Sequence, residues 1–300
     1  MFFSIFRHVL LKHFCSQMTI AYHGQSHNYS SLAVEAFAKQ ANIKSDQIPI
    51  STYEALLSSN HQYCFLAVQN SSHTLSDMFR LIEEHQWNVV AEYYWSKSLQ
   101  LVSTGTDIAK IKHIVVVGHI AFVCKQFLEQ TKVHVIHVED TAEACQYILD
   151  KKSDAYAAIC PKETATHFNL NTIVQRVDDP NSMTRFFLVS KSKDVLNTQQ
   201  PFKTTLLVRI QNRAGSLHKA IGCFATRDIN ICQIESFPSS KATNALCPWE
   251  HYFCLDVQGT LKETKVQRAI ENLQEFCTKV TVLGSYPVYV HDQEMASVGL

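Results

Sequence analysis

The chain has 300 residues, 46% of them hydrophobic, and its 27 basic and 27 acidic residues balance to a formal net charge of zero. This length predicts two or three domains with a buried core, and the balanced charge offers no basic field to nucleic acid or to an anionic membrane. The glycines form no glycine-rich phosphate-binding motif, which argues against a nucleotide cofactor.

The cysteines and histidines are numerous but do not have metal-binding spacing. The ten cysteines include no Cys-x-x-Cys pair and many lie in apolar runs, which predicts reduced, buried thiols in a cytoplasmic protein. His23 with His27 and His134 with His137 lack an accompanying set of carboxylates. No apolar run reaches the roughly 18 residues that a membrane-spanning helix needs. We therefore predict no metal, no cofactor and no membrane partner.

The pattern from residue 18 onward alternates strands with helices. Residues 1–17 precede it as an extension of unassigned role, because Met18 opens the first strand. Strands are predicted at 19–22, 63–68, 89–94, 98–103, 114–117, 133–138 and 155–159, and helices at 30–41, 74–87, 118–128, 142–150 and 161–167. Ser30, and either Asp140 or Thr141, are predicted helix caps.

This alternation predicts an α/β fold with two lobes and a ligand cleft at the carboxyl ends of the strands. The lobes are expected at about 18–96 plus 183–190 and at 100–182. Residues 191–203 are polar and aperiodic, which predicts a linker.

A smaller domain is predicted after the linker, at 204–290, with 291–300 as a tail. Strands at 204–210, 229–237, 251–257 and 280–283 and helices at 216–226 and 264–278 give the order βαββαβ of a ferredoxin-like domain. A long polar loop, 239–248, joins its two middle strands.

One short run, Asn181 to Val189, places a hydroxyl beside a guanidinium ahead of an apolar strand. The planar guanidinium of Arg185 carries several N–H donors that can bind both oxygens of a carboxylate. The Thr184 hydroxyl can donate a hydrogen bond to a departing oxygen. Taken alone, such a pair is the entry of a strand with a solvated arginine.

Several segments together resemble prephenate dehydratase, the lyase that forms phenylpyruvate from prephenate in phenylalanine biosynthesis. In the C-terminal part these segments are 212–217, 228–231, 234–238 and 283–287, and in the first part they are 22–30, 67–71, 117–119, 140–142 and 184–186. The resemblance implies a two-lobed, periplasmic-binding-protein-like catalytic domain followed by an ACT domain, a regulatory βαββαβ module that senses amino acids.

Four of the positions at which the chain departs from the family's pattern bear on its sites. Gln69 stands where the family has glutamate, Gly118 where it has serine, Ser182 where it has asparagine, and Phe237 where it has arginine. An amide at position 69 can neither act as a base nor carry charge.

The resemblance implies functional residues, each named here at its position in this sequence. Thr184 would hydrogen-bond the leaving hydroxyl, and Arg185 would anchor a carboxylate or hold the strand of Thr184. The implied substrate-binding residues are Gln69, Asn70, Ser71, Gly118, Ser182 and Phe186. The implied L-phenylalanine-binding residues are Gly215, Ser216, Leu217, Asn230, Glu235 and Ser236.

The resemblance further implies a cytoplasmic homodimer or homotetramer that acts on prephenate without a cofactor and is inhibited by L-phenylalanine. Two alternatives stay open from the sequence. One is a catalytically degraded, amino-acid-binding pseudoenzyme. The other is an arogenate dehydratase, because the Gln69 amide and the Asp140 carboxylate would suit the amino group of arogenate.

Overall fold

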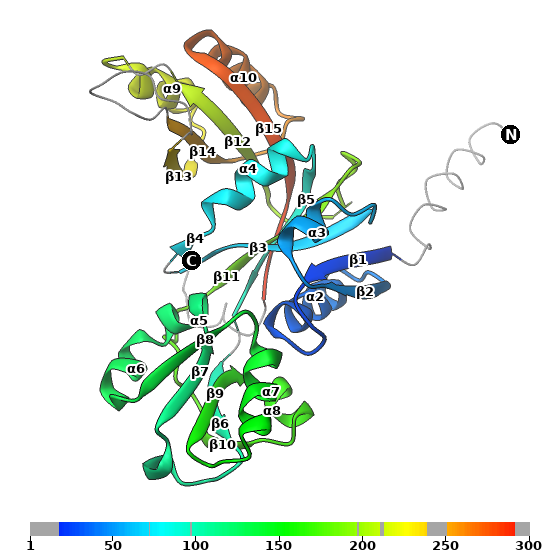
Figure 1. Ribbon diagram of the computed structural model, residues 1–300. Coiled ribbons are helices and arrows are strands. Elements are labelled where there is room, and N and C mark those ends of the chain that lie inside the picture. The colour runs from blue at the N-terminus through cyan, green and yellow to red at the C-terminus, as the bar shows by residue number, and fades with distance from the viewer. Residues whose placement is uncertain are drawn as a thin grey trace, which may run out of the picture.

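The computed structural model describes residues 18–71, 73–96, 98–196, 198–210, 213–238 and 251–291. The predicted extension at 1–17, the loop at 239–248, Asn212 and the tail from 292 onward lie outside these described residues. Figure 1 shows three regions in a row, with the first lobe between the second lobe and the C-terminal domain.

The first lobe is an α/β unit to which the chain returns late with one more strand. Its elements are β1 (Met18–His23), α2 (Tyr29–Gln40), β2 (Ser45–Ile50), α3 (Tyr53–Leu57), β3 (Tyr63–Asn70), β4 (His73–Thr74), α4 (Ser76–Glu84), β5 (Asn88–Trp95) and β11 (Thr184–Ser190). Strand β11 lies between β3 and β5 and is antiparallel to both, so every residue of β11 is buried.

The second lobe has its own five-stranded sheet, in the order β10-β6-β9-β7-β8. Its elements are β6 (Leu99–Ser103), η1 (Ile108–Lys110), β7 (His113–Val117), α5 (Gly118–Val123), α6 (Lys125–Thr131), β8 (His134–Val138), α7 (Thr141–Lys151), β9 (Tyr156–Pro161), α8 (Lys162–His167) and β10 (Asn171–Val174). Because β7 is parallel to β8 and β9, its apolar residues 114–117 are buried on both faces.

The C-terminal domain is ferredoxin-like. Its elements are β12 (Phe202–Ile210), α9 (Ser216–Ala225), β13 (Ile231–Pro238), β14 (His251–Gln258), α10 (Thr264–Phe276) and β15 (Cys277–Val290). The strand order β13-β14-β12-β15 is antiparallel throughout. Helix α10 forms because Val266, Ala269, Ile270 and Leu273 repeat at helical spacing, and that face is buried.

One strand connects the C-terminal domain to the first lobe. Strand β15 pairs with β12 up to Pro287 and then runs parallel to β5 from Val288 to Val290, so the two sheets form one ten-stranded sheet (Figure 1). A shared apolar core lies against the junction, and in it the ring of Phe237 stacks on that of Phe79 of α4, with centroids 5.7 Å apart.

The predicted fold class, two α/β lobes followed by a βαββαβ unit, is confirmed. Of the two residues predicted as alternative caps of α7, the cap is Asp140, whose side chain accepts the N–H of Glu143 at 2.8 Å. The cap predicted for α2 is wrong. Asn28, not Ser30, accepts the N–H of Ser31, at 2.8 Å.

Three further differences follow from local chemistry. Strand β2 was not predicted because it contains Pro49 and polar residues, which an edge strand tolerates. The predicted helix at 118–128 is two helices, separated at Cys124. Strand β15 extends well beyond the predicted 280–283 because its second half pairs with the first lobe. Within the described ranges, no helix is long and apolar enough to cross a membrane.

Candidate active site

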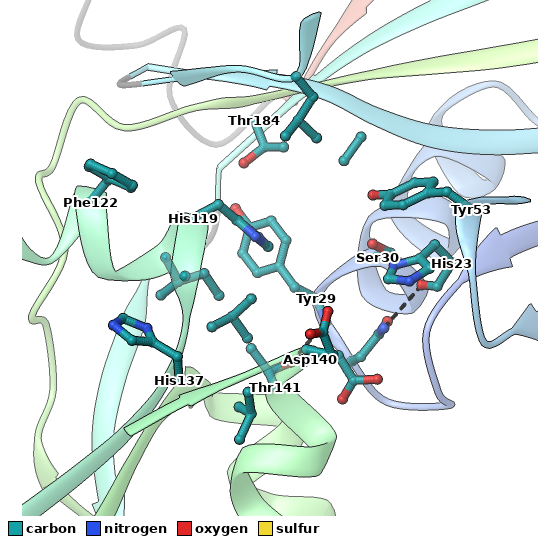
Figure 2. Close-up of a pocket in the computed structure, with 18 of the residues that line it drawn as sticks. His23, Tyr29, Ser30, Tyr53, His119, Phe122, His137, Asp140, Thr141 and Thr184 are labelled. Carbon is teal, nitrogen blue, oxygen red and sulfur yellow. Dashed lines mark hydrogen bonds between the residues drawn. The ribbon is translucent and has the colours of Figure 1, made fainter. Parts of the chain in front are cut away.

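A cavity of about 430 Å³ lies between the two lobes. It opens where β7 and β8 end, which is the edge at which α/β sheets bind ligands (Figure 2). Its lining residues are His23, Asn28, Tyr29, Ser30, Tyr53, Ala67, Leu75, Val117, Gly118, His119, Ile120, Phe122, His137, Val138, Glu139, Asp140, Thr141, Thr184 and Phe186.

Strand β11 presents Thr184 to this cavity. Side chains alternate along a strand, so Thr184 and Phe186 line the cavity while Arg185 points to the opposite face of the sheet. Thr184 is 9% exposed, and Figure 2 shows its hydroxyl directed toward the space beside Tyr29 and His119. The result is a hydroxyl donor held on a buried strand at the wall of the cavity.

The positive ends of three helices converge on the cavity. Helix α2 begins after Asn28, α5 begins at Gly118 and α7 begins after Asp140, and all three positions line the cavity. A helix N-terminus carries roughly half an elementary positive charge, which favours carboxylates. The lining contains no Lys or Arg among the described residues, but it does contain the carboxylates of Glu139 and Asp140.

Hydrogen bonds join the lobes around the cavity. They run from Gln25 N to Asp140 Oδ2 (3.0 Å), from Tyr29 N to Thr141 Oγ1 (3.0 Å), from Asn70 Nδ2 to the His119 carbonyl (3.3 Å) and from Thr164 Oγ1 to the His27 carbonyl (2.8 Å). Asp140 contributes one of these bonds with Oδ2, while its Oδ1 caps α7 within the second lobe. The lobes are therefore held in fixed register at the cavity.

His23 and Tyr53 form a stacked pair on the wall that belongs to the first lobe, with ring centroids 4.1 Å apart. Burial lowers the pKa of His23, although the nearby Asp140 carboxylate opposes this shift. Burial raises the pKa of Tyr53 to about 12. Both rings are thus neutral at pH 7, and this wall offers hydrogen bonds and stacking rather than charge.

The other face of β11 carries a buried ionic network. Arg185 is 2% exposed, and its Nε donates to Glu92 Oε1 at 2.5 Å while its Nη2 lies 2.6 Å from Asp256 Oδ2. Lys203 Nζ donates to the same Glu92 oxygen at 3.2 Å. Burial alone would lower the pKa of Arg185, but Glu92 and Asp256 hold it well above its usual value. The network joins the first lobe to the C-terminal domain.

The fold and the cavity match one family of known proteins. The family model for prephenate dehydratase matches residues 20–194, which is more than half of the chain. The chain belongs to the prephenate dehydratase family. The resemblance seen in the sequence is thereby confirmed for the first two lobes, which contain the cavity and Thr184.

Two curated relatives match over 91% of this chain. One is the arogenate dehydratase/prephenate dehydratase 2, chloroplastic, of Arabidopsis thaliana, 26% identical over 74% of its own length. The other is the prephenate dehydratase of Lactococcus lactis subsp. cremoris, 27% identical over 98% of its length. Relatives named for arogenate and for prephenate therefore resemble this chain about equally.

Solved structures show the same three-region fold. Prephenate dehydratase from Arthrobacter aurescens in complex with L-Phe superposes with a TM-score of 0.76, at 22% identity, and covers 90% of each chain. A protein described as GqqA, a novel type of quorum quenching acylase, superposes with a TM-score of 0.72, at 25% identity, over 90% of this chain and 98% of its own. Since the fold occurs under both descriptions, the chemistry has to be argued from the site.

The substrate-binding residues implied by the family take different places. Gly118 and Phe186 line the cavity. Asn70 lies behind the lining and holds the His119 carbonyl. Ser71 hydrogen-bonds the backbone of Met183, and the N–H of Ser182 donates to the Asp179 carbonyl. These last contacts shape the approach to Thr184 rather than the cavity wall.

The expected contact of Arg185 with a substrate carboxylate does not fit its position. Its guanidinium is enclosed by Glu92, Asp256 and the Tyr286 hydroxyl, on the face of β11 away from the cavity. The alternative, that Arg185 holds the strand of Thr184, agrees with the geometry. Gln69 points to the same side, where its Oε1 lies 3.4 Å from Arg185 Nη1.

Several lining residues were missed among the site residues implied by the sequence, namely Tyr29, Tyr53, His137 and Thr141. Tyr29 and Thr141 lie inside segments that match the family, so a signal was present. Tyr53 lies in α3, a helix that the sequence pattern did not predict. No group of three or more potential metal ligands gathers anywhere in the described part of the chain.

The residues implied to bind L-phenylalanine lie in the C-terminal domain. Gly215 has a φ of +79° and leads into α9, which begins with Ser216 and Leu217. Glu235 and Ser236 lie on β13, the edge strand of the sheet. Phe237, which replaces the family's arginine, is buried against α4 and does not face solvent.

Proposed function

We propose that this protein is a lyase that removes hydroxide and carbon dioxide from prephenate and so forms phenylpyruvate. The observation that carries the proposal is the Thr184 hydroxyl, which β11 presents to the cavity between the lobes of a prephenate dehydratase family member.

The reaction needs little covalent help from the protein. The electron pair of the bond to the ring carboxylate enters the ring as carbon dioxide leaves, and the opposite carbon–oxygen bond breaks with its electron pair on the oxygen. The departing hydroxide takes up a proton and becomes water. Because the ring becomes aromatic, the protein has to orient the substrate and stabilise the leaving oxygen.

In this scheme Thr184 donates a hydrogen bond to the leaving oxygen. The N-termini of α2, α5 and α7 supply the positive potential that the substrate carboxylates need, in place of the Lys or Arg that the described lining lacks. Phe186 and the stacked pair His23–Tyr53 contact the ring. No residue has to act as a general base.

A second substrate, arogenate, is favoured by the carboxylates at the cavity. Arogenate differs from prephenate by an ammonium group, and Glu139 and Asp140 would attract that group while repelling a keto acid. The relatives named as arogenate dehydratases support this alternative.

Turnover of both compounds by the purified protein tests the proposal. Phenylpyruvate is measured with prephenate and phenylalanine with arogenate. Glu139→Gln removes one cavity carboxylate and keeps the length of the side chain, so it should shift the ratio of kcat/KM values toward prephenate by about tenfold. A folded protein that consumes neither compound above background would instead support the non-catalytic reading, in which the protein only binds amino acids.

Regulation by L-phenylalanine forms part of the proposal. It is supported by the βαββαβ domain and by the L-Phe complex of the neighbouring structure. Calorimetric titration with L-phenylalanine up to millimolar concentration should show binding that Glu235→Gln weakens. Absence of heat in that range would remove the effector from the proposal. Cytoplasmic location and a dimer or tetramer stay predictions from the resemblance.

A further inference from the structure

The ionic network behind β11 is balanced in charge. Two cations, Arg185 and Lys203, face two anions, Glu92 and Asp256, and three of these four side chains are at most 2% exposed. Arg185 and Glu92 belong to the first lobe, whereas Lys203 and Asp256 belong to the C-terminal domain. Removing one member would leave an uncompensated charge in a dry interior, which is strongly destabilising.

A pair of amides closes this network on its half-exposed side. Gln69 Oε1 of β3 accepts from Gln233 Nε2 of β13 at 3.0 Å, and Gln233 Oε1 accepts from Arg185 Nη1 at 3.1 Å. Gln233 Nε2 also lies 3.2 Å from Glu235 Oε1. A carboxylate at position 69 would add a negative charge beside this set, so the amide keeps the balance.

Thr184 is the immediate neighbour of Arg185 on β11. The backbone of Arg185 pairs with Gln69 on one side and with Tyr94 on the other, so both sides of this residue are fixed. A displaced guanidinium would pull on the β11 backbone that presents Thr184 to the cavity, against the restraint of these two strands. Misplacement of a reacting group by about 1 Å can cost 10²-fold in rate.

We propose that Arg185 is a positioning residue through which the C-terminal domain fixes Thr184, and that Gln69 and Gln233 are a matched amide pair that keeps this contact neutral. Gln69 then acts at the domain junction and not on the substrate. The rate effect rests on the proposed function of Thr184, whereas the matched pair does not.

A double-mutant cycle tests the matched pair. Gln69→Glu adds an unbalanced charge at a half-buried position beside the network and should lower the Tm by about 5 °C. Gln233→Lys alone places a cation beside Arg185, which the Glu235 carboxylate partly offsets, and should lower the Tm by a smaller amount. The combined variant restores neutrality and should return to within about 2 °C of the wild type. Gln130→Glu, at an exposed position on α6, makes the same charge change and should leave the Tm unchanged.

Turnover of the same variants tests the positioning role. With the rate expressed per folded molecule, Gln69→Glu should lower kcat about tenfold with little change in KM, and the combined variant should recover it. Leu273→Ala, in the separate core of α10, should lower the Tm but not kcat per folded molecule. That control separates positioning from general loss of stability.

Two results would overturn the proposal. One is a combined variant whose Tm equals the sum of the two single shifts, which would mean that the amides do not interact. The other is a normal kcat in Gln69→Glu despite a lowered Tm. A wild type without turnover would refute the proposed function alone, because the Tm cycle would still report on the network.

Discussion

The two faces of β11 differ sharply in chemistry. On one face Thr184 and Phe186 border a cavity whose described lining has no Lys or Arg. On the other face Arg185 lies in a dry cluster with two carboxylates and a lysine. Two residues adjacent in sequence therefore serve different regions, one the proposed chemistry and the other the attachment of the C-terminal domain.

This difference shows that two adjacent motif residues on a strand serve opposite faces of the sheet. Side chains at i and i+1 point to opposite faces of a sheet, so a Thr-Arg pair on a buried strand cannot address one ligand with both side chains. Charge is concentrated at the junction, where every cation meets an anion, while the cavity relies on helix ends and hydroxyls. Variants that act on one face only should separate the two roles.

The largest effect is expected from Arg185→Met, which leaves Glu92 and Asp256 without their shared cation. The free energy of unfolding, measured by urea titration, should fall by about 3–5 kcal/mol. Arg209→Met is the matched control, because Arg209 faces Glu83 at 3.6 Å with a side chain 37% exposed, and such pairs contribute at most about 1 kcal/mol. If the free energy of unfolding fell equally in the two variants, the buried network would stabilise the fold no more than an exposed ion pair does.

Thr184→Val should act on the other face and leave the fold intact. The substitution removes the hydroxyl and keeps the β-branched shape, so kcat should fall about 10²–10³-fold with little change in Tm. Thr184→Ser keeps a hydroxyl and should retain most of the activity. Wild-type turnover by the valine variant would exclude the proposed role of Thr184.

Gly118→Ser should raise the activity, because it adds a hydroxyl donor to the cavity wall. A Cβ at Gly118 would meet no atom within 4 Å, and the residue lines the cavity, so the family's serine fits without rearrangement. We expect kcat to rise by about tenfold, less than the loss for removing an established donor. Gly222→Ser, equally unobstructed but on α9, should not change kcat. A lowered kcat in Gly118→Ser would show that the smaller residue is required here.

The smallest expected effect is a loss of folding stability at acidic pH that is caused by His23. Burial lowers the pKa of His23 in the folded chain, so below the ordinary value of about 6.5 the unfolded chain takes up a proton that the folded chain does not. Stability should therefore fall as the pH drops below about 6.5 and should be unaffected by this group above it. In His23→Gln the decline in unfolding free energy from pH 7 to 5 should be shallower. If the unfolding free energies of the wild type and His23→Gln declined in parallel with pH, the lowered pKa of His23 would be contradicted.

The sequence allowed most of the architecture to be predicted, because periodic apolar residues mark elements such as α10 and β7. The family motifs likewise led to Thr184. The role of Arg185 could not be read in the same way, because its partners Glu92 and Asp256 lie 93 and 71 positions away in the chain. Only tertiary pairing brings these groups together. Tyr53 escaped prediction because α3, with five residues, is too short to show a period.

Strand β15 pairs with β12 in the C-terminal domain and with β5 in the first lobe, so cutting the chain between the two regions would break a sheet. Gly284 allows β15 to pass close to β5, since a Cβ there would lie 2.2 Å from the Val89 carbonyl oxygen. A fragment ending near residue 190 would lack β15 and leave residues 92–94 of β5 as an open strand edge, with the apolar surface around Phe187 uncovered. Such an edge invites pairing between molecules. The first two lobes expressed alone should therefore aggregate, because the C-terminal domain covers this edge and apolar surface in the whole chain.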